Sequence, residues 1–196
     1  MSTIQEIINR VDEIKLNTYS ENAKTAWINQ IEGWVKDKVI QTYGYFDVLR
    51  IKDQAAYDIP SGVTFSNIVM AYMDKYPIHK LDARSFERAG YFLGPDGKIN
   101  IYPVPGQDDI TPGLRFVYKL SHIPYKYPWD KDAELLVPSP YDAIYENYIY
   151  AMIDWHNREF AAYNNTMNMY NESWKEFANW YKQNNPIPPT KVSNIW

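Results

Sequence analysis

The stretch "YNNTMNMYNESWKEFANWY", from Tyr163 to Tyr181, limits the possible folds of this chain more than any other segment. Its large apolar residues recur at alternating intervals of four and three residues. This a/d spacing puts them on one side of a helix. Most other positions hold Asn, Glu, Lys or Ser, so the sequence predicts a long helix with an aromatic seam that packs against a second surface. The seam consists of Tyr163, Met167, Tyr170, Trp174, Phe177 and Tyr181.

A second helical pattern precedes the seam and begins at Ser139, a good N-cap, and Pro140, which suits a first helical position. One unbroken helix from Pro140 to Gln183 would be about 66 Å long at ~1.5 Å per residue, far beyond the usual helix length. We therefore expect a break at His156–Arg158 or at Asn164–Asn165, because Asn tolerates the left-handed conformation. The first position is preferred, since it keeps the seam on one helix.

Two shorter helices are predicted within residues 1–44. Thr3 and Glu6 have the spacing of a capping box, followed by apolar residues on one helical face. Thr18 and Glu21 repeat that spacing before a second apolar stripe that includes Trp27. The short connection between the two patterns predicts a helical hairpin.

Residues 45–134 have a different character, with frequent Pro and Gly and an apolar period close to two. Gly94 to Gly97 supplies turn residues between two runs with strand character, and Ile99 and Ile101 are expected on one face. Asp74-Lys75 separates two further strand-like runs, and "GLRFVYKL" reads as another strand. We predict a small antiparallel sheet or sandwich of roughly four to six strands.

The predicted fold is therefore α+β. A helical body, made of the N-terminal hairpin (1–44) and two long C-terminal helices (135–183), is interrupted by an inserted β module (45–134). Residues 184–196, "NNPIPPTKVSNIW", are expected to form an extended tail, because their prolines exclude a helix.

Composition excludes several functional classes. The chain has no cysteine, which rules out disulfides, zinc–thiolate sites and cysteine nucleophiles. The net charge of −4, with both signs interspersed, argues against a basic surface for nucleic acid. The charged N-terminal segment lacks the apolar region of a secretory signal, and no apolar run approaches the ~18 residues of a membrane span.

Neither a catalytic nor a metal-binding constellation is evident. The three histidines lack the spacing of metal ligands, and no phosphate-binding loop or nucleophile elbow occurs. The acidic groups Asp108-Asp109 and Asp130/Asp132 are interpreted as solvated loops, with too few ligands for calcium. We therefore predict no catalytic, cofactor-binding or metal-ligating residue and no cofactor.

The composition is unusual in its high content of aromatic residues, with 18 Tyr and 7 Trp. These side chains suit a Tyr-rich core, a surface that is buried on assembly, or stacking on sugars. The absence of chemistry favours contact with other proteins. The candidate contact residues are Tyr163, Tyr170, Trp174, Trp180, Ile195 and Trp196.

The segment "ELLVPSPYDAIYENYIYAMIDWHNREFAAYNNTMNMYN" resembles the head–tail connector (adaptor) proteins of tailed bacteriophages. The N-terminal "IQEIINRVDEIKLNTYS" and the pair "INIYPVP" and "TPGLRFVY" are similar to other parts of that family, so the resemblance covers most of the chain. These are packing motifs rather than chemical ones. One difference is "HNRE" at the turn between the last two helices, where related sequences often have a glycine.

The resemblance implies a structural virion protein without enzymatic activity. It implies a ring of about a dozen copies in the neck, between the portal protein and the tail or stopper proteins. DNA would pass through this ring without sequence-specific binding, and the protein would reside in the host cytoplasm before assembly. The alternatives are another neck component, such as a stopper or tail-completion protein, and a carbohydrate-binding module on a helical stalk. An enzyme is the least favoured reading.

Overall fold

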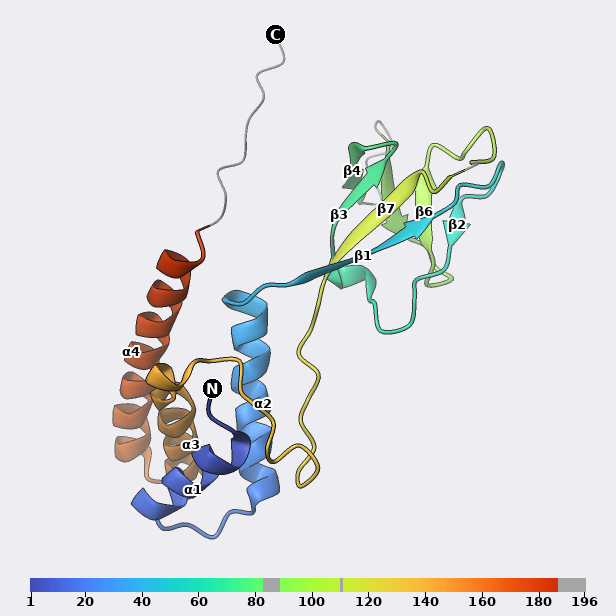
Figure 1. Ribbon diagram of the computed structural model, residues 1–196. Coiled ribbons are helices and arrows are strands. Elements are labelled where there is room, and N and C mark those ends of the chain that lie inside the picture. Colours follow the sequence, from blue (N-terminus) through green and yellow to red (C-terminus); the bar gives the residue numbers. More distant parts are fainter. Residues whose placement is uncertain (83–88, 110, 187–196) are drawn as a thin grey trace. The chain divides into compact units, whose positions relative to one another are not determined.

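The computed structural model describes residues 1–82, 89–109 and 111–186. They form an α+β protein with four α-helices and a curled seven-stranded sheet (Figure 1). The chain divides into two compact units, a helical unit (residues 1–41 and 121–196) and a sheet unit (residues 42–120). Residues 121–134, which we expected in the β module, belong to the helical unit. Backbone hydrogen bonds tie this segment to the first helix, for example from Ile4 N to Ala133 O at 3.3 Å.

The helical unit contains α1 (Ile4–Ile14), α2 (Glu21–Lys38), α3 (Ala143–His156) and α4 (Phe160–Asn184), with a short 3-10 helix, η2 (Ser139–Tyr141), before α3. The capping box of Thr3 and Glu6 is present, as predicted. The predicted cap of α2 is wrong by two residues. Ser20 is the N-cap instead of Thr18, and its hydroxyl accepts a hydrogen bond from Ala23 N.

The predicted break at His156–Arg158 is confirmed. Arg158 N donates to Trp155 O at 3.1 Å and Glu159 N donates to Asp154 O at 2.9 Å, which is the hydrogen-bond pattern of a Schellman motif. The left-handed residue of this motif is Arg158, with φ of 64°, and not Asn157 as its type suggested. An arginine thus occupies the position that glycine usually takes.

The seam of α4 packs into the core of the helical unit. Tyr170 and Phe177 are buried there, and Met167, Trp174 and Tyr181 cover the same cluster partly. The other fully buried residues come from all three remaining helices and from the segment before η2. They are Ile4, Ile7, Ile8, Val11, Ile28, Ile31, Val35, Leu135, Val137, Ile144, Tyr145, Ile149 and Ile153.

The sheet unit is larger than expected and is not wholly antiparallel. Its strands are β1 (Tyr43–Val48), β2 (Ala56–Tyr57), β3 (Ile68–Met73), β4 (Tyr76–Lys80), β5 (Gly90–Leu93), β6 (Ile99–Tyr102) and β7 (Leu114–Lys119), with η1 (Phe65–Asn67) before β3. They lie in the order β1-β7-β3-β4-β5-β6-β2. The pair β4–β5 is parallel. The two edge strands explain the undercount, because β2 has only two residues and β1 contains a glycine.

Both predicted hairpins are present. Asp74 and Lys75 connect β3 to β4 with positive φ at both residues, as a two-residue type I′ turn requires. Gly94 to Gly97 connects β5 to β6, and Ile99 and Ile101 are buried on one face as expected. The sheet unit has its own core, formed by Tyr57, Ile68, Ala71, Ile78, Tyr91, Ile99, Ile101, Leu114 and Phe116.

Candidate contact surfaces

The structure separates the six candidate contact residues. Tyr170 is buried, and its ring lies 6.2 Å from that of the half-buried Trp174. Trp180 is half-buried against Tyr141, with ring centroids 5.0 Å apart. Ile195 and Trp196 lie outside the described residues. Most of the seam therefore stabilises the helical unit itself, and Tyr170 offers almost no surface to a second protein.

Tyr163 is half-buried and contacts an exposed aromatic group at the turn between α3 and α4. This turn cluster consists of Trp155, Phe160 and Tyr163. The Trp155 ring lies 5.5 Å from Phe160 and 5.1 Å from Tyr163, yet Trp155 remains 48% exposed and Phe160 54% exposed. The rings contact one another and are held by the Schellman turn, so a large apolar surface is presented without much conformational freedom. The sequence analysis did not predict Phe160 or Trp155 as contact residues, because neither belongs to the periodic seam of α4.

A second exposed tryptophan, Trp129, was also missed. It is 82% exposed on a turn that local hydrogen bonds hold closed. Lys126 N donates to an Asp130 carboxylate oxygen at 2.7 Å, and Asp130 N returns a bond to Lys126 O at 3.0 Å. Lys131 O accepts from Gln5 N at 3.0 Å, which fastens the turn to the start of α1. The signal in the sequence was "YPWDKD", a tryptophan between proline and charged residues, where burial is improbable.

The buried carboxylate of Glu32 binds both ends of the segment that carries this turn, at Tyr125 and Leu136. Glu32 of α2 is fully buried and accepts hydrogen bonds from the Tyr145 hydroxyl, from the Tyr125 hydroxyl at 3.0 Å and from Leu136 N at 3.1 Å. Burial raises the pKa of Glu32, and the three hydrogen bonds oppose that shift. One turn earlier, the Asn29 amide binds Tyr125 N and Tyr125 O at 2.8 and 3.0 Å. Glu32 and Asn29 thus hold both ends of the turn segment on α2.

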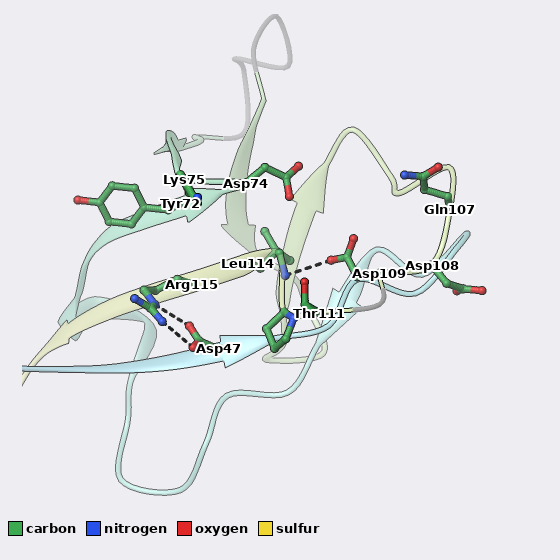
Figure 2. A pocket seen from close by; sticks show the side chains of 12 residues that line it. Asp47, Tyr72, Asp74, Lys75, Gln107, Asp108, Asp109, Thr111, Leu114 and Arg115 are labelled. Atoms are coloured by element: carbon green, nitrogen blue, oxygen red, sulfur yellow. Dashed lines mark hydrogen bonds and ion pairs between the residues drawn. The ribbon is translucent and has the colours of Figure 1, made fainter.

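The sheet unit has an open groove of about 750 Å³ beside the β3–β4 turn (Figure 2). Under it, Arg50 joins two carboxylates. Its guanidinium donates to Asp109 at 2.8 Å and to Asp74 at 2.7 Å. Asp109 also accepts from Gly113 N at 3.2 Å, and the hydrogen bond from Arg50 lowers the pKa of Asp109. Interpreting Asp109 as a solvated loop residue was therefore wrong, since this carboxylate joins the loop after β6 to Arg50, two residues after the end of β1.

Three other charged residues of the groove also have partners. Arg115 on β7 makes a bidentate ion pair with Asp47 on β1, with distances of 2.7 and 2.8 Å (Figure 2). The guanidinium also lies over the Tyr45 ring, 4.5 Å from its centroid. Asp108 accepts from Lys52 N at 2.7 Å. These contacts join β7 to β1 and the loop after β6 to the segment after β1.

Two histidines have structural surroundings. His156 stacks on Trp27 at 5.6 Å, and His122 lies 3.0 Å from the Asn29 amide oxygen, with a pKa lowered by burial. Within the described ranges, no three side chains of His, Asp or Glu are placed to hold a metal ion. In the same part of the chain, no helix combines the length and apolar character needed to cross a membrane.

No protein-family model and no curated protein matches the chain.

Proposed function

We propose that this chain is a structural protein of a tailed-phage particle, a head–tail connector whose copies form a ring between the portal and the tail. In this proposal the helical unit is the ring-forming body, and the sheet unit is an insertion that reaches further components of the neck. DNA passes through the ring without being bound in a sequence-specific way. Partners are the portal protein, tail or stopper proteins and other copies of the chain.

The observation that carries the proposal is the exposure of large aromatic side chains on two hydrogen-bonded turns of the helical unit. Trp129 and the turn cluster around Trp155 remain accessible to solvent, although the same unit packs most of the aromatic seam against its core. Tryptophans on rigid turns are typical anchors of protein interfaces. Because their turns are held by hydrogen bonds, little conformational entropy would be lost on binding.

The segment that carries the resemblance also has a structural place in this unit. Leu135 and Val137 are fully buried, so the "LLVP" run is a packed lead-in to η2 and α3. Asp142, at the start of α3, accepts from Arg10 and from the Ser2 hydroxyl, which joins this lead-in to α1. Such packing supports a scaffold role and assigns no chemistry to the motif.

The test is the presence and copy number of the chain in purified phage particles from its source. Quantitative mass spectrometry should find it in a ratio of about one to one with the portal protein, as a ring of about a dozen copies requires. A ratio near one half would instead indicate a six-fold neck component such as a stopper. Absence from particles would overturn the proposal.

A matched pair of variants tests the carrying observation. Trp129→Ala and Trp155→Ala should leave the helical content of the purified protein unchanged and lower its occupancy in particles. Tyr76→Ala, which removes an exposed ring from the sheet unit, is the control for the loss of an aromatic surface. Equal occupancy for all three variants would show that the two turns of the helical unit are not contact sites.

A further inference from the structure

The groove of the sheet unit is lined by a row of side chains that crosses three neighbouring strands. Arg115 of β7 lies opposite Asp47 of β1 on one side and opposite Tyr72 of β3 on the other, and all three line the groove. Their sequence neighbours Ala71 and Phe116 are buried in the core of the unit. Because side chains alternate along a strand, the row lies on the opposite face of the sheet, which is open to the groove.

This row is held in place and is accessible. The bidentate ion pair fixes the Arg115 guanidinium on Asp47, and the Tyr45 ring supports it from one side. The side chain of Arg115 is nevertheless 52% exposed and that of Asp47 31% exposed. Arginine has N–H groups beyond the two that are used here, and each carboxylate oxygen has a further lone pair. The pair thus presents donors and acceptors side by side, next to the aromatic ring of Tyr72.

A second set of polar groups faces this row across the groove. Figure 2 shows Gln107 and Asp108 on the opposite side of the groove from Tyr72 and Arg115. Gln107 is exposed, and its amide makes no hydrogen bond within the described residues. The Asp108 carboxylate accepts one hydrogen bond, from Lys52 N at 2.7 Å, and is otherwise exposed. Both sides of the groove therefore offer a donor and an acceptor.

The charges of the groove disfavour a charged ligand. An anion would meet several carboxylates, while Arg50 and Arg115 are already engaged in ion pairs. A cation would find most of these carboxylates neutralised by the same arginines. An uncharged polar ligand avoids both conflicts. The carboxylates of the lining are Asp47, Asp74, Asp108 and Asp109.

These features fit a sugar. A sugar hydroxyl donates and accepts at once, so two neighbouring hydroxyls match an N–H group beside a carboxylate oxygen. The C–H face of a sugar ring is apolar and can pack on an aromatic ring. The volume of about 750 Å³ lies in the range of ~300–1,000 Å³ that is typical of small-molecule sites. We propose that this groove binds an uncharged oligosaccharide, with one sugar ring on Tyr72 and its hydroxyls on the pair of Arg115 and Asp47.

A single-stranded nucleic acid is the main competing ligand, because it also uses aromatic rings and arginines on a sheet face. Such proteins guide the phosphate backbone along a positively charged groove. Here the arginines are paired with carboxylates, which would repel phosphates. The inference goes beyond the proposed function, since it concerns the sheet unit alone and needs no particle.

Binding is measured on the purified full-length protein by saturation-transfer NMR, followed by titration calorimetry. The uncharged probes are tetrasaccharides of glucose, galactose, mannose and N-acetylglucosamine in α and β linkage. The charged probes are a heparin tetrasaccharide and a short oligothymidylate. Saturable binding of at least one uncharged probe is expected, and the charged probes should not bind.

Variants connect this binding to the groove. Tyr72→Ala should weaken it about ten-fold, as expected for the loss of a stacked ring. Tyr72→Phe should retain it, because it keeps the ring and removes a hydroxyl that contacts the Met70 sulfur at 3.4 Å. Gln107→Ala should weaken binding several-fold without affecting the melting temperature, since Gln107 is exposed. Tyr76→Ala is the matched control, a tyrosine of the same hairpin that is 76% exposed and lies outside the groove.

The proposal is overturned if none of the uncharged probes binds, or if binding is confined to the charged probes. It is also overturned if Tyr72→Ala and Gln107→Ala bind the sugar as tightly as Tyr76→Ala does. Sugar binding by a chain that is absent from phage particles would retain this inference and remove the proposed function. A chain that is present in particles and binds no sugar would have the reverse consequence.

Discussion

The substitution Glu32→Ala should destabilise the helical unit more than its single side chain suggests. Glu32 is fully buried and accepts from two tyrosine hydroxyls and one backbone N–H. Alanine removes all three acceptor contacts at once. The Tyr125 hydroxyl keeps an alternative acceptor, Glu134 O at 3.2 Å, but the Tyr145 hydroxyl and Leu136 N lose the acceptors described for them.

The magnitude follows from those two donors. A buried donor left without a partner costs about 1–3 kcal/mol, so two of them amount to roughly 2–6 kcal/mol. Part of this loss is offset, because alanine no longer requires a carboxylate to be buried. A net loss of about 3 kcal/mol is expected, a large share of the ~5–15 kcal/mol that stabilises a typical domain.

Urea unfolding followed by far-UV circular dichroism measures this loss, because all four α-helices of the described residues belong to the helical unit. Tyr145→Phe is the matched partner, and a double-mutant cycle with Glu32→Ala isolates their mutual contact. The cycle should give a coupling free energy of about 1–3 kcal/mol, as expected for neighbours that share a hydrogen bond. A loss below about 1 kcal/mol for Glu32→Ala would refute the reasoning, since it would mean that Tyr145 and Leu136 do not depend on Glu32.

Three further outcomes are expected. Burial raises the folded-state pKa of Glu32 above 4.5. The free energy of unfolding therefore contains a proton-linked part that is fully present below that value and is lost as pH rises through the raised pKa. Glu32→Gln should remove this pH dependence in urea unfolding at several pH values. Arg158→Gly should stabilise the helical unit by about 0.5 kcal/mol, because φ of 64° favours glycine, whereas Arg158→Ala should not. Phe177→Ala should cost about 3–5 kcal/mol and exceed Trp174→Ala, because Phe177 is fully buried and Trp174 is not; equal losses in chemical denaturation would contradict this.

Local patterns predicted those elements of the fold that depend on neighbours in sequence. The spacing along α4, the Thr3 capping box and the turn at Gly94 to Gly97 each involve residues a few positions apart, and the structure contains all three. The break after His156 was located correctly, because a break there keeps the seam on one helix. Its left-handed residue was not, because intrinsic preference favoured Asn157 over Arg158.

Contacts between distant segments were beyond such patterns. Arg50 and Asp109 are separated by 59 positions, so nothing local indicated that Asp109 is the ion-pair partner of an arginine and not a solvated acid. Glu32 is 104 positions from Leu136, and its surroundings on α2 resemble those of any surface glutamate. The edge strand β2 has two residues and exists through its pairing with β6. Register and partner choice of this kind are set by the tertiary fold.

The aromatic content shows why composition alone assigned the contact residues poorly. The sequence spacing of aromatic residues is the same whether their rings are buried within the chain or exposed for a second protein. The periodic seam residues were therefore predicted as contact residues. In the structure, two of these periodic residues, Tyr170 and Phe177, are buried in the core of their own chain. The exposed rings of Trp129 and Trp155 instead lie at turns or helix ends, where no period can report them. A surface for a second protein is therefore better sought among aromatic residues that break the helical pattern than among those that satisfy it.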